Sequence, residues 1–254
     1  MKNMMKLAGA ACVLATAFGG MARAADDEHP AVKRAFDLPP SADLAYSISA
    51  RQKGLALNGD ATLSWRADGA KYSVSADSRV AILGKLTENR SSGAIDGYGL
   101  APNEFYDKRF RKEALTATFD REARTISFSD GDKSYPIRGG EQDRVSISWQ
   151  LIAVARAAKD KFKTGSEWKF FVVGPRDADA WTFRVVGREK IQGGAGIGEV
   201  DAVHVSRATP PGSREQTLDM WLAPDNEWYP VKLRFTEGDR SDVVEQTLER
   251  VTKK

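Results

Sequence analysis

The sequence predicts a mainly-β protein: a large curved antiparallel sheet or half-barrel with one amphipathic helix, over about residues 143–163, packed on its apolar face. First, apolar and polar residues alternate with a period of two in many short segments, which is typical of strands with one buried face. Second, turn residues such as Asp68-Gly69 separate these segments. Third, a single segment has the three- and four-residue spacing of a helix.

Residues 1–24 have the layout of a secretory signal peptide. A basic start precedes an apolar run over residues 7–18, and Ala22-Arg23-Ala24 forms an A-x-A cleavage site. The apolar run is too short for a membrane span, which needs about 20 residues, so no transmembrane anchor is expected. We expect cleavage between Ala24 and Ala25 and a location in the periplasm or outside the cell.

Residues 25–43 are predicted to form an extended tether, because they mix charges with prolines and show no period. From residue 44 to residue 252 no linker-like stretch interrupts the pattern. These residues are therefore expected to form a single antiparallel β domain that contains the helix.

Strands are expected wherever the alternation is clear. In residues 55–66, for example, Leu57, Leu63 and Trp65 share one face. The strands predicted before the helix are 44–50, 55–66, 72–80, 104–111, 114–121, 124–129 and 133–138, and those after it are 167–173, 180–190, 198–208, 214–223, 228–237 and 242–251. Residues 168–173 are apolar on both faces, which predicts cover on both sides. The proline in Trp228-Tyr229-Pro230 predicts a bulge or an edge position, because it cannot donate a ladder hydrogen bond.

The predicted helix has an apolar stripe that should pack on the sheet. Its members recur at three- and four-residue steps and are Ile147, Leu151, Ala155, Ala158 and Phe162. Asp143 is expected to cap the N-terminus and Gly165 to end the helix. Arg156 and Lys159 are expected to face water.

Composition excludes several classes of function. The chain has 38 Lys+Arg against 35 Asp+Glu, and the excess lies in the leader, so the remainder carries no net charge. A nucleic-acid partner is therefore not expected. The one cysteine, Cys12, is also in the leader, and the chain has two histidines. No Cys-based or His-rich metal site and no cofactor are predicted.

Two local features allow a functional interpretation, but a structural one is favoured for each. His204 lies near Glu199 and Asp201, which could imitate a base with its orienting acid, yet it fits a partly exposed strand histidine. The glycines of Gly193–Gly198 have the wrong spacing for a dinucleotide loop and connect two strands. They are expected to form a flexible hairpin loop, and the roles of both features stay open.

Large apolar side chains carry more information than these polar motifs. A curved sheet lined by such residues beneath a helix can leave an apolar cavity. The candidate residues for a cavity or its lid are Trp149, Leu151, Phe162, Trp168, Trp181 and Trp221. The alternative is that they simply fill the core.

The segment from Met220 to Leu233 resembles the closing motif of the domain-of-unknown-function family 3108. The matching residues are Trp221, Asp225, Pro230 and Val231: a strand with a Trp, a turn with an Asp, and a Pro-Val start of the next strand. The resemblance extends over about residues 40–250. It implies an exported bacterial protein with a mainly antiparallel sheet and brings no established reaction. More distantly, the chain is similar to lipoprotein-carrier half-barrels, in which a helical lid covers an apolar cavity.

Three functions remain in competition. The favoured one is a non-catalytic binding or carrier module that holds an apolar group, such as an acyl chain or lipid, between the sheet and the helix. The second is an envelope scaffold or interaction protein with a filled core. The third is a hydrolase that uses carboxylates which the sequence cannot pair.

Overall fold

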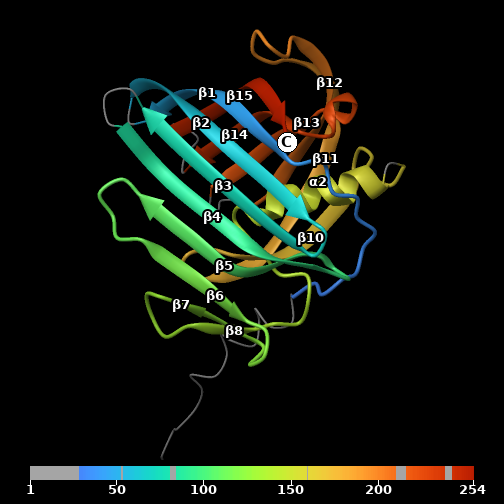
Figure 1. Cartoon of the computed structure of the whole chain (residues 1–254). Helices are drawn as coiled ribbons and strands as arrows, with labels where there is room; N and C mark the ends of the chain where they lie inside the picture. The colour runs from blue at the N-terminus through green and yellow to red at the C-terminus, as the bar shows by residue number, and fades with distance from the viewer. Residues whose placement is uncertain (1–28, 53, 81–83, 159, 210–215, 238–241) are drawn as a thin grey trace, which may run out of the picture.

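The computed structural model describes residues 29–52, 54–80, 84–158, 160–209, 216–237 and 242–254. Within these residues, one fifteen-stranded sheet curves around one α-helix (Figure 1). This arrangement confirms the predicted mainly-β half-barrel with a single helix. The predicted leader, residues 1–24, lies outside the described residues.

The strands follow one another across the sheet almost in chain order. Their bounds are β1 (Ala42–Gln52), β2 (Leu55–Asp68), β3 (Lys71–Val80), β4 (Gly84–Asp96), β5 (Gly99–Arg109), β6 (Leu115–Asp120), β7 (Thr125–Phe128), β8 (Ser134–Pro136), β9 (Gln142–Asp143), β10 (Glu167–Val173), β11 (Ala178–Gln192), β12 (Glu199–Ala208), β13 (Thr217–Leu222), β14 (Pro230–Glu237) and β15 (Asp242–Lys253). The first and last strands, β1 and β15, pair near the middle of the sheet. Neighbouring strands are antiparallel, except that β9 and β10 are parallel.

The strand β4 was not among the predicted strands. The predicted strand at 104–111 also begins earlier, since β5 starts at Gly99. The reason for the missing prediction is that β4 presents Thr87, Asn89 and Ser91 to the inner face, opposite Ser78, Ala76 and Val74 of β3. Polar residues on the buried side remove the alternation on which strand prediction depends.

The helix α2 (Ser146–Ala158) is shorter than the predicted 143–163. Asp143 belongs to β9, yet its Oδ1 accepts the N–H groups of Val145 and Ser146 at 2.8 Å, so it caps the turn that leads into α2. At the other end, the Lys161 N–H donates to the Ala158 carbonyl in a tight turn. Phe162 is therefore buried from a turn beyond the helix.

Both sides of α2 are covered. Leu151 to Ala155 are all buried, and on the side away from the sheet the Asp37 N–H donates to the Ala153 carbonyl at 2.9 Å. The expectation that Arg156 faces water is wrong, because its side chain is 17% exposed and forms ion pairs with Asp37 and Glu227. Lys159 lies outside the described residues.

Residues 29–41, predicted as part of a tether, have no regular secondary structure and pack along the domain. The His29 ring stacks on Phe171 with centroids 4.2 Å apart, and its Nε2 lies 3.0 Å from Oε1 of the buried Glu141. Further along, the Pro39 carbonyl accepts the Trp65 Nε1–H at 3.0 Å. These contacts hold the segment against the domain.

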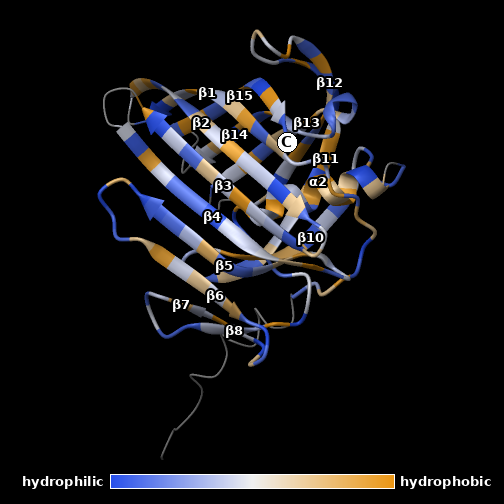
Figure 2. Cartoon of the chain, in the orientation of Figure 1, coloured by the Kyte–Doolittle hydropathy of each residue, from blue (hydrophilic) through white to orange (hydrophobic). Residues whose placement is uncertain are grey.

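The described residues form two apolar clusters, and β10 lies between them. Phe170 and Val172 face the main core inside the curve of the sheet, whereas Phe171 and Val173 face a second cluster built on β5 to β8. Both faces of β10 are thus covered, as predicted, and β5 to β8 cover one of them. Figure 2 shows the alternation of hydrophobic and hydrophilic residues along the long strands of the sheet.

Candidate functional site

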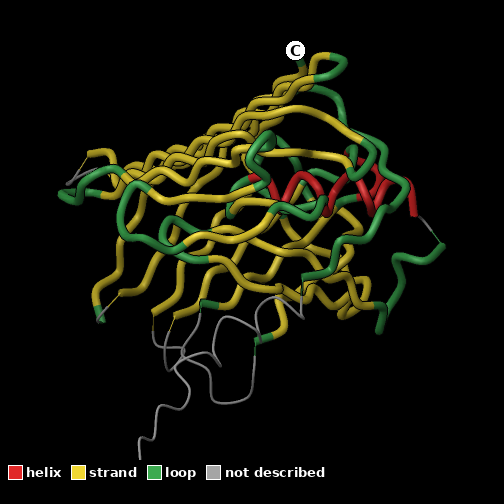
Figure 3. Tube along the Cα trace, turned by 90° about the horizontal axis from the view of Figure 1, so that it is seen from below, coloured by secondary structure: helices red, strands yellow, loops and turns green. Residues whose placement is uncertain are grey.

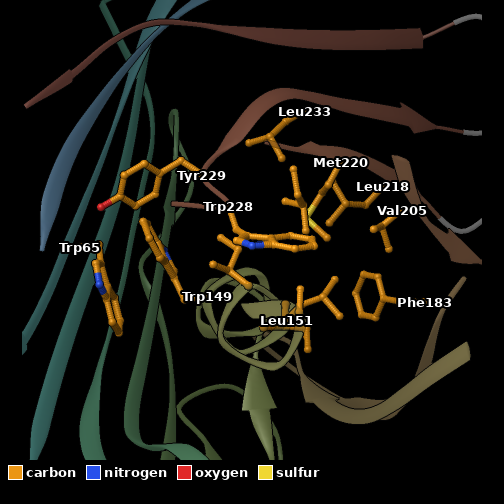
Figure 4. Close-up of a cluster of buried hydrophobic side chains, with 14 of the residues drawn as sticks. Trp65, Trp149, Leu151, Phe183, Val205, Leu218, Met220, Trp228, Tyr229 and Leu233 are labelled. Atoms are coloured by element: carbon orange, nitrogen blue, oxygen red, sulfur yellow. The ribbon is translucent and has the colours of Figure 1, made fainter. Parts of the chain in front are cut away.

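The inner face of the sheet beneath α2 is packed with large side chains (Figure 4). Trp149 of α2 stacks on Trp65 of β2 with ring centroids 4.8 Å apart, and Tyr229 meets Trp149 edge-on at 6.2 Å. Leu151 is fully buried in the same cluster. At this position the helix and the sheet pack directly on each other.

The structure brings most of the predicted cavity residues into this main core. Trp149, Leu151 and Phe162 are all buried there. Trp168 is partly buried with its ring 5.5 Å from Phe162, and Trp181 lies 6.2 Å from the ring of Phe183.

Trp221 does not join them, because it belongs to the outer face of the sheet. Its strand neighbours Met220 and Leu222 are in the main core, and Trp221 pairs across the sheet with His204 and Lys232. The rings of Trp221 and His204 stack at 4.4 Å, and the Trp221 Nε1–H donates to Glu189 at 2.7 Å.

His204 also contacts an acid on the outer face. Its Nε2 lies 2.9 Å from Oδ1 of Asp219. Burial by itself raises the pKa of Asp219, but the hydrogen bonds with His204 and Ser206 lower it overall. His204 is therefore a partly exposed strand histidine held between an acid and an aromatic ring.

Beyond α2, the inner face carries an apolar row that crosses five neighbouring strands. Direct cross-strand pairing joins its members, which are Leu57, Ala50, Val244, Phe235 and Leu218. Leu218 is buried, and the other four are partly exposed. Figure 3 shows α2 inside the curve of the sheet and the strands running past it. The apolar row is thus a partly exposed stretch of the inner face, and Ala50, Val244 and Phe235 also pack against the main core.

Gln246 lies on the same inner face, in the next row toward α2, opposite Ile48 and Leu233. Its Oε1 is buried and has no hydrogen-bond partner among the described residues. A buried acceptor without a partner costs free energy, which a hydrogen-bond donor at this position would recover.

A buried polar cluster connects the start of α2 to the inner face. The Ser91 hydroxyl donates to Oδ2 of Asp143 and lies 2.9 Å from the Tyr72 hydroxyl. The Ser146 hydroxyl accepts the Asp143 N–H at 2.8 Å. Burial raises the pKa of Asp143 from its ordinary value of 3.8 to about 6, although these hydrogen bonds oppose the shift.

We expect Asp143→Asn to change the pH dependence of stability. Because the pKa of Asp143 is raised in the folded state, the folded chain holds a proton between pH 4 and 6 that the unfolded chain has released. Stability from this group therefore falls as the pH rises through that window. Asparagine has no such proton, so the free energy of unfolding of Asp143→Asn should improve relative to wild type by about 2 kcal/mol between pH 4 and pH 7.

Urea unfolding of both proteins at pH 4, 5, 6 and 7 measures this difference. Asp143→Asn can still accept the two N–H groups and donate to Ser91, so the cap should persist. If the difference in free energy of unfolding between the two proteins is the same at all four pH values, Asp143 does not titrate in this window.

The closing motif builds a turn between β13 and β14. Asp225 is exposed in the short 3-10 helix η1 (Pro224–Asn226), and Val231 is buried in the main core. The Pro230 carbonyl accepts the Tyr46 hydroxyl at 2.7 Å, which joins this turn to β1. The ladder is irregular between Trp221 and Leu222, opposite the predicted bulge at Pro230.

A sequence profile of the proteins of unknown function DUF3108 matches residues 45–246, which include this motif. The chain belongs to the DUF3108 family. No reaction is assigned to the family by this match, and comparison with curated proteins finds no relative.

Two solved structures resemble this DUF3108 chain at low identity. One is a protein with a YmcC-like fold from Bacteroides fragilis, with 11% identity and a TM-score of 0.34, covering 86% of this chain and 100% of the other. The second is a DUF1329 family protein from Desulfovibrio piger, with 8% identity and a TM-score of 0.30, covering 85% and 87%.

In the part of the DUF3108 chain that the structure describes, no helix is long and apolar enough to cross a membrane. The described residues also contain no group of three or more His, Cys, Asp or Glu placed to hold a metal ion.

The loop Gly193–Gly198 forms the predicted hairpin, and its Gly194 N–H donates to the Leu248 carbonyl at 2.8 Å, which anchors it on β15.

Proposed function

We propose that this DUF3108 protein is a non-catalytic binding or carrier module for an apolar group, such as an acyl chain or lipid. The observation that carries the proposal is the apolar row, which is a continuous and partly exposed stretch of the inner face. Beneath α2 the helix fills the curve itself, so the group would lie along the apolar row and not under the helix.

The chemistry of the apolar row suits a chain of methylene groups. Each methylene that leaves water gains about 0.8 kcal/mol, so an acyl chain can bind without a polar recognition motif. Gln246 adds one polar contact beside the row, which an amide or hydroxyl next to the acyl chain would satisfy. This combination favours an acyl group attached to a hydrogen-bond donor.

We further propose that the protein acts in the periplasm or outside the cell after removal of residues 1–24. The basic start, short apolar run and A-x-A site support this location. N-terminal sequencing of the protein from the periplasmic fraction should find Ala25 first. Finding Met1, or a lipid on Cys12, would contradict it.

Titration with a fluorescent fatty acid tests the binding proposal. The wild-type chain should bind the probe and should gain thermal stability in its presence. Val244→Asp, which places a charge in the apolar row, should lower the affinity by about tenfold or more, because a carboxylate would have to lose its water against the acyl chain.

Val243→Asp is the matched control. Val243 is the preceding residue on β15 and pairs with Arg51 and Thr236 on the outer face, away from the apolar row. The Val243→Asp variant should bind the probe with the same affinity as wild type. If wild type binds no acyl probe of any chain length, or if both variants lose binding equally, the carrier proposal fails and the scaffold with a filled core replaces it.

A further inference from the structure

A cleft lies at the opposite end of β14 from the apolar row. It has a volume of about 410 Å³, which is within the range of small-molecule sites. The cleft is lined by Asp37, Arg156, Asp160, Arg188, Pro224 and Trp228. Trp228 precedes the start of β14 while Phe235 of the apolar row lies near its end, so the two sites are separate.

The charges of this cleft fall into two groups. Arg156 is already engaged, because its Nη1 lies 2.8 Å from Glu227 and its Nη2 lies 3.2 Å from Asp37. Its hydrogen bond is the main reason why the pKa of Glu227 is lowered. Arg188 and Asp160 are exposed, and among the described residues neither forms an ion pair.

The aromatic wall of the cleft is fixed in place by its backbone. Glu227 and Trp228 both have positive φ, 55° and 62°, a conformation uncommon for residues other than glycine. The Ala223 carbonyl holds the turn by accepting the N–H groups of Asn226 and Trp228 at 3.0 and 2.8 Å. The Trp228 ring packs edge-on against Phe162 at 5.7 Å. Non-glycine residues are held in such conformations where surrounding contacts require it, and these positions cluster at binding sites.

We propose that this cleft binds a small zwitterion, with a phosphate or carboxylate group on Arg188 and an ammonium group on Asp160. A simple anion would also meet the carboxylates of Asp37 and Asp160, and a simple cation would meet two arginines. A ligand with both charges satisfies each free group and presents its linking atoms to Trp228. Arginine is the residue best suited to bind phosphate and carboxylate groups.

Calorimetric titration of the full chain tests this site. The zwitterionic probes are glycerophosphoethanolamine and 4-aminobutyrate, and the single-charge probes are inorganic phosphate and ethanolamine. At least one zwitterion should bind about tenfold or more tightly than either single-charge probe, since each additional satisfied charge contributes about 1.4 kcal/mol or more. Arg188→Gln and Asp160→Asn should each weaken that binding by a similar factor.

Arg184→Gln is the matched control, because Arg184 lies on the same strand as Arg188 but pairs with Glu167 at 2.6 Å outside the cleft. It should leave the affinity unchanged. Co-sedimentation with vesicles that contain phosphatidylethanolamine separates the two sources of such a group. If the wild-type chain binds the vesicles and Arg188→Gln abolishes that binding, the ligand is a lipid headgroup. If only the soluble probes bind, the ligand is a free metabolite.

Three results would overturn the zwitterion site: no binding of any zwitterionic probe, equal affinity for phosphate or ethanolamine alone, or an unchanged affinity in Arg188→Gln. The soluble probes in the calorimetric titration have no acyl chain, so the apolar row takes no part in that titration. The carrier proposal and the zwitterion site can therefore fail independently.

Discussion

Leu151→Ala should lower the free energy of unfolding by about 2–5 kcal/mol. Leu151 is fully buried where α2 meets the inner face, and the aromatic rings around it cannot close the space that the substitution leaves. The loss combines the removed apolar contact with the cavity left behind. Stability margins of native proteins are about 5–15 kcal/mol, so this single change should remove a large share.

Leu55→Ala is the matched control for this substitution. Leu55 is 66% exposed at the start of β2, so the same chemical change should alter stability by about 0.5 kcal/mol or less. Urea denaturation followed by far-UV circular dichroism measures both variants. Equal effects of the two substitutions would mean that α2 is not packed into the main core.

Gln150→Leu should cost about 2–4 kcal/mol for a different reason. β6 pairs with β5 only from Glu104 onward, so the edge of β5 before Glu104 has no neighbouring strand on that side. The Gln150 side chain binds this edge in place of a strand. Its Oε1 accepts the Leu100 N–H and its Nε2 donates to the Tyr98 carbonyl, both at 2.8 Å. Leucine would leave these two backbone groups without a partner in a buried setting.

Gln52→Leu, at an exposed position on β1, provides the control and should stay within about 0.5 kcal/mol of wild type. Gly99→Ala gives an independent check. Gly99 has a φ of 107°, and a side chain there would collide with the Gln150 amide, so this variant should be destabilised as well. Wild-type stability of both Gln150→Leu and Gly99→Ala would refute the role of this amide.

The sequence predicts the strands whose buried side chains are apolar, but it does not predict a strand whose buried side chains are polar. Alternation identified the strands whose inner residues are hydrophobic, such as β2 with Leu63 and Trp65. It failed on β4, whose inner face is buried through hydrogen bonds such as that of Ser91. The helix was predicted too long because Phe162 continues the apolar spacing, although it is buried from a turn.

The candidate sites were less predictable because they depend on distant pairs. The sequence shows that Trp221 is apolar, but both neighbours are apolar too, so its face could not be assigned without the register of β12 and β13. The apolar row needs the register of five strands. The cleft joins Asp37, Arg188 and Trp228, whose spacing along the chain carries no signal.

Native mass spectrometry of the full chain, purified without detergent from the cells that express it, tests whether the apolar row holds an apolar group. We expect a population that carries the added mass of an acyl-containing molecule. That population should be depleted in Val244→Asp and retained in Val243→Asp. A wild-type spectrum with the mass of the bare chain alone, or an added mass that Val244→Asp leaves unchanged, would contradict the claim that the apolar row holds an apolar group.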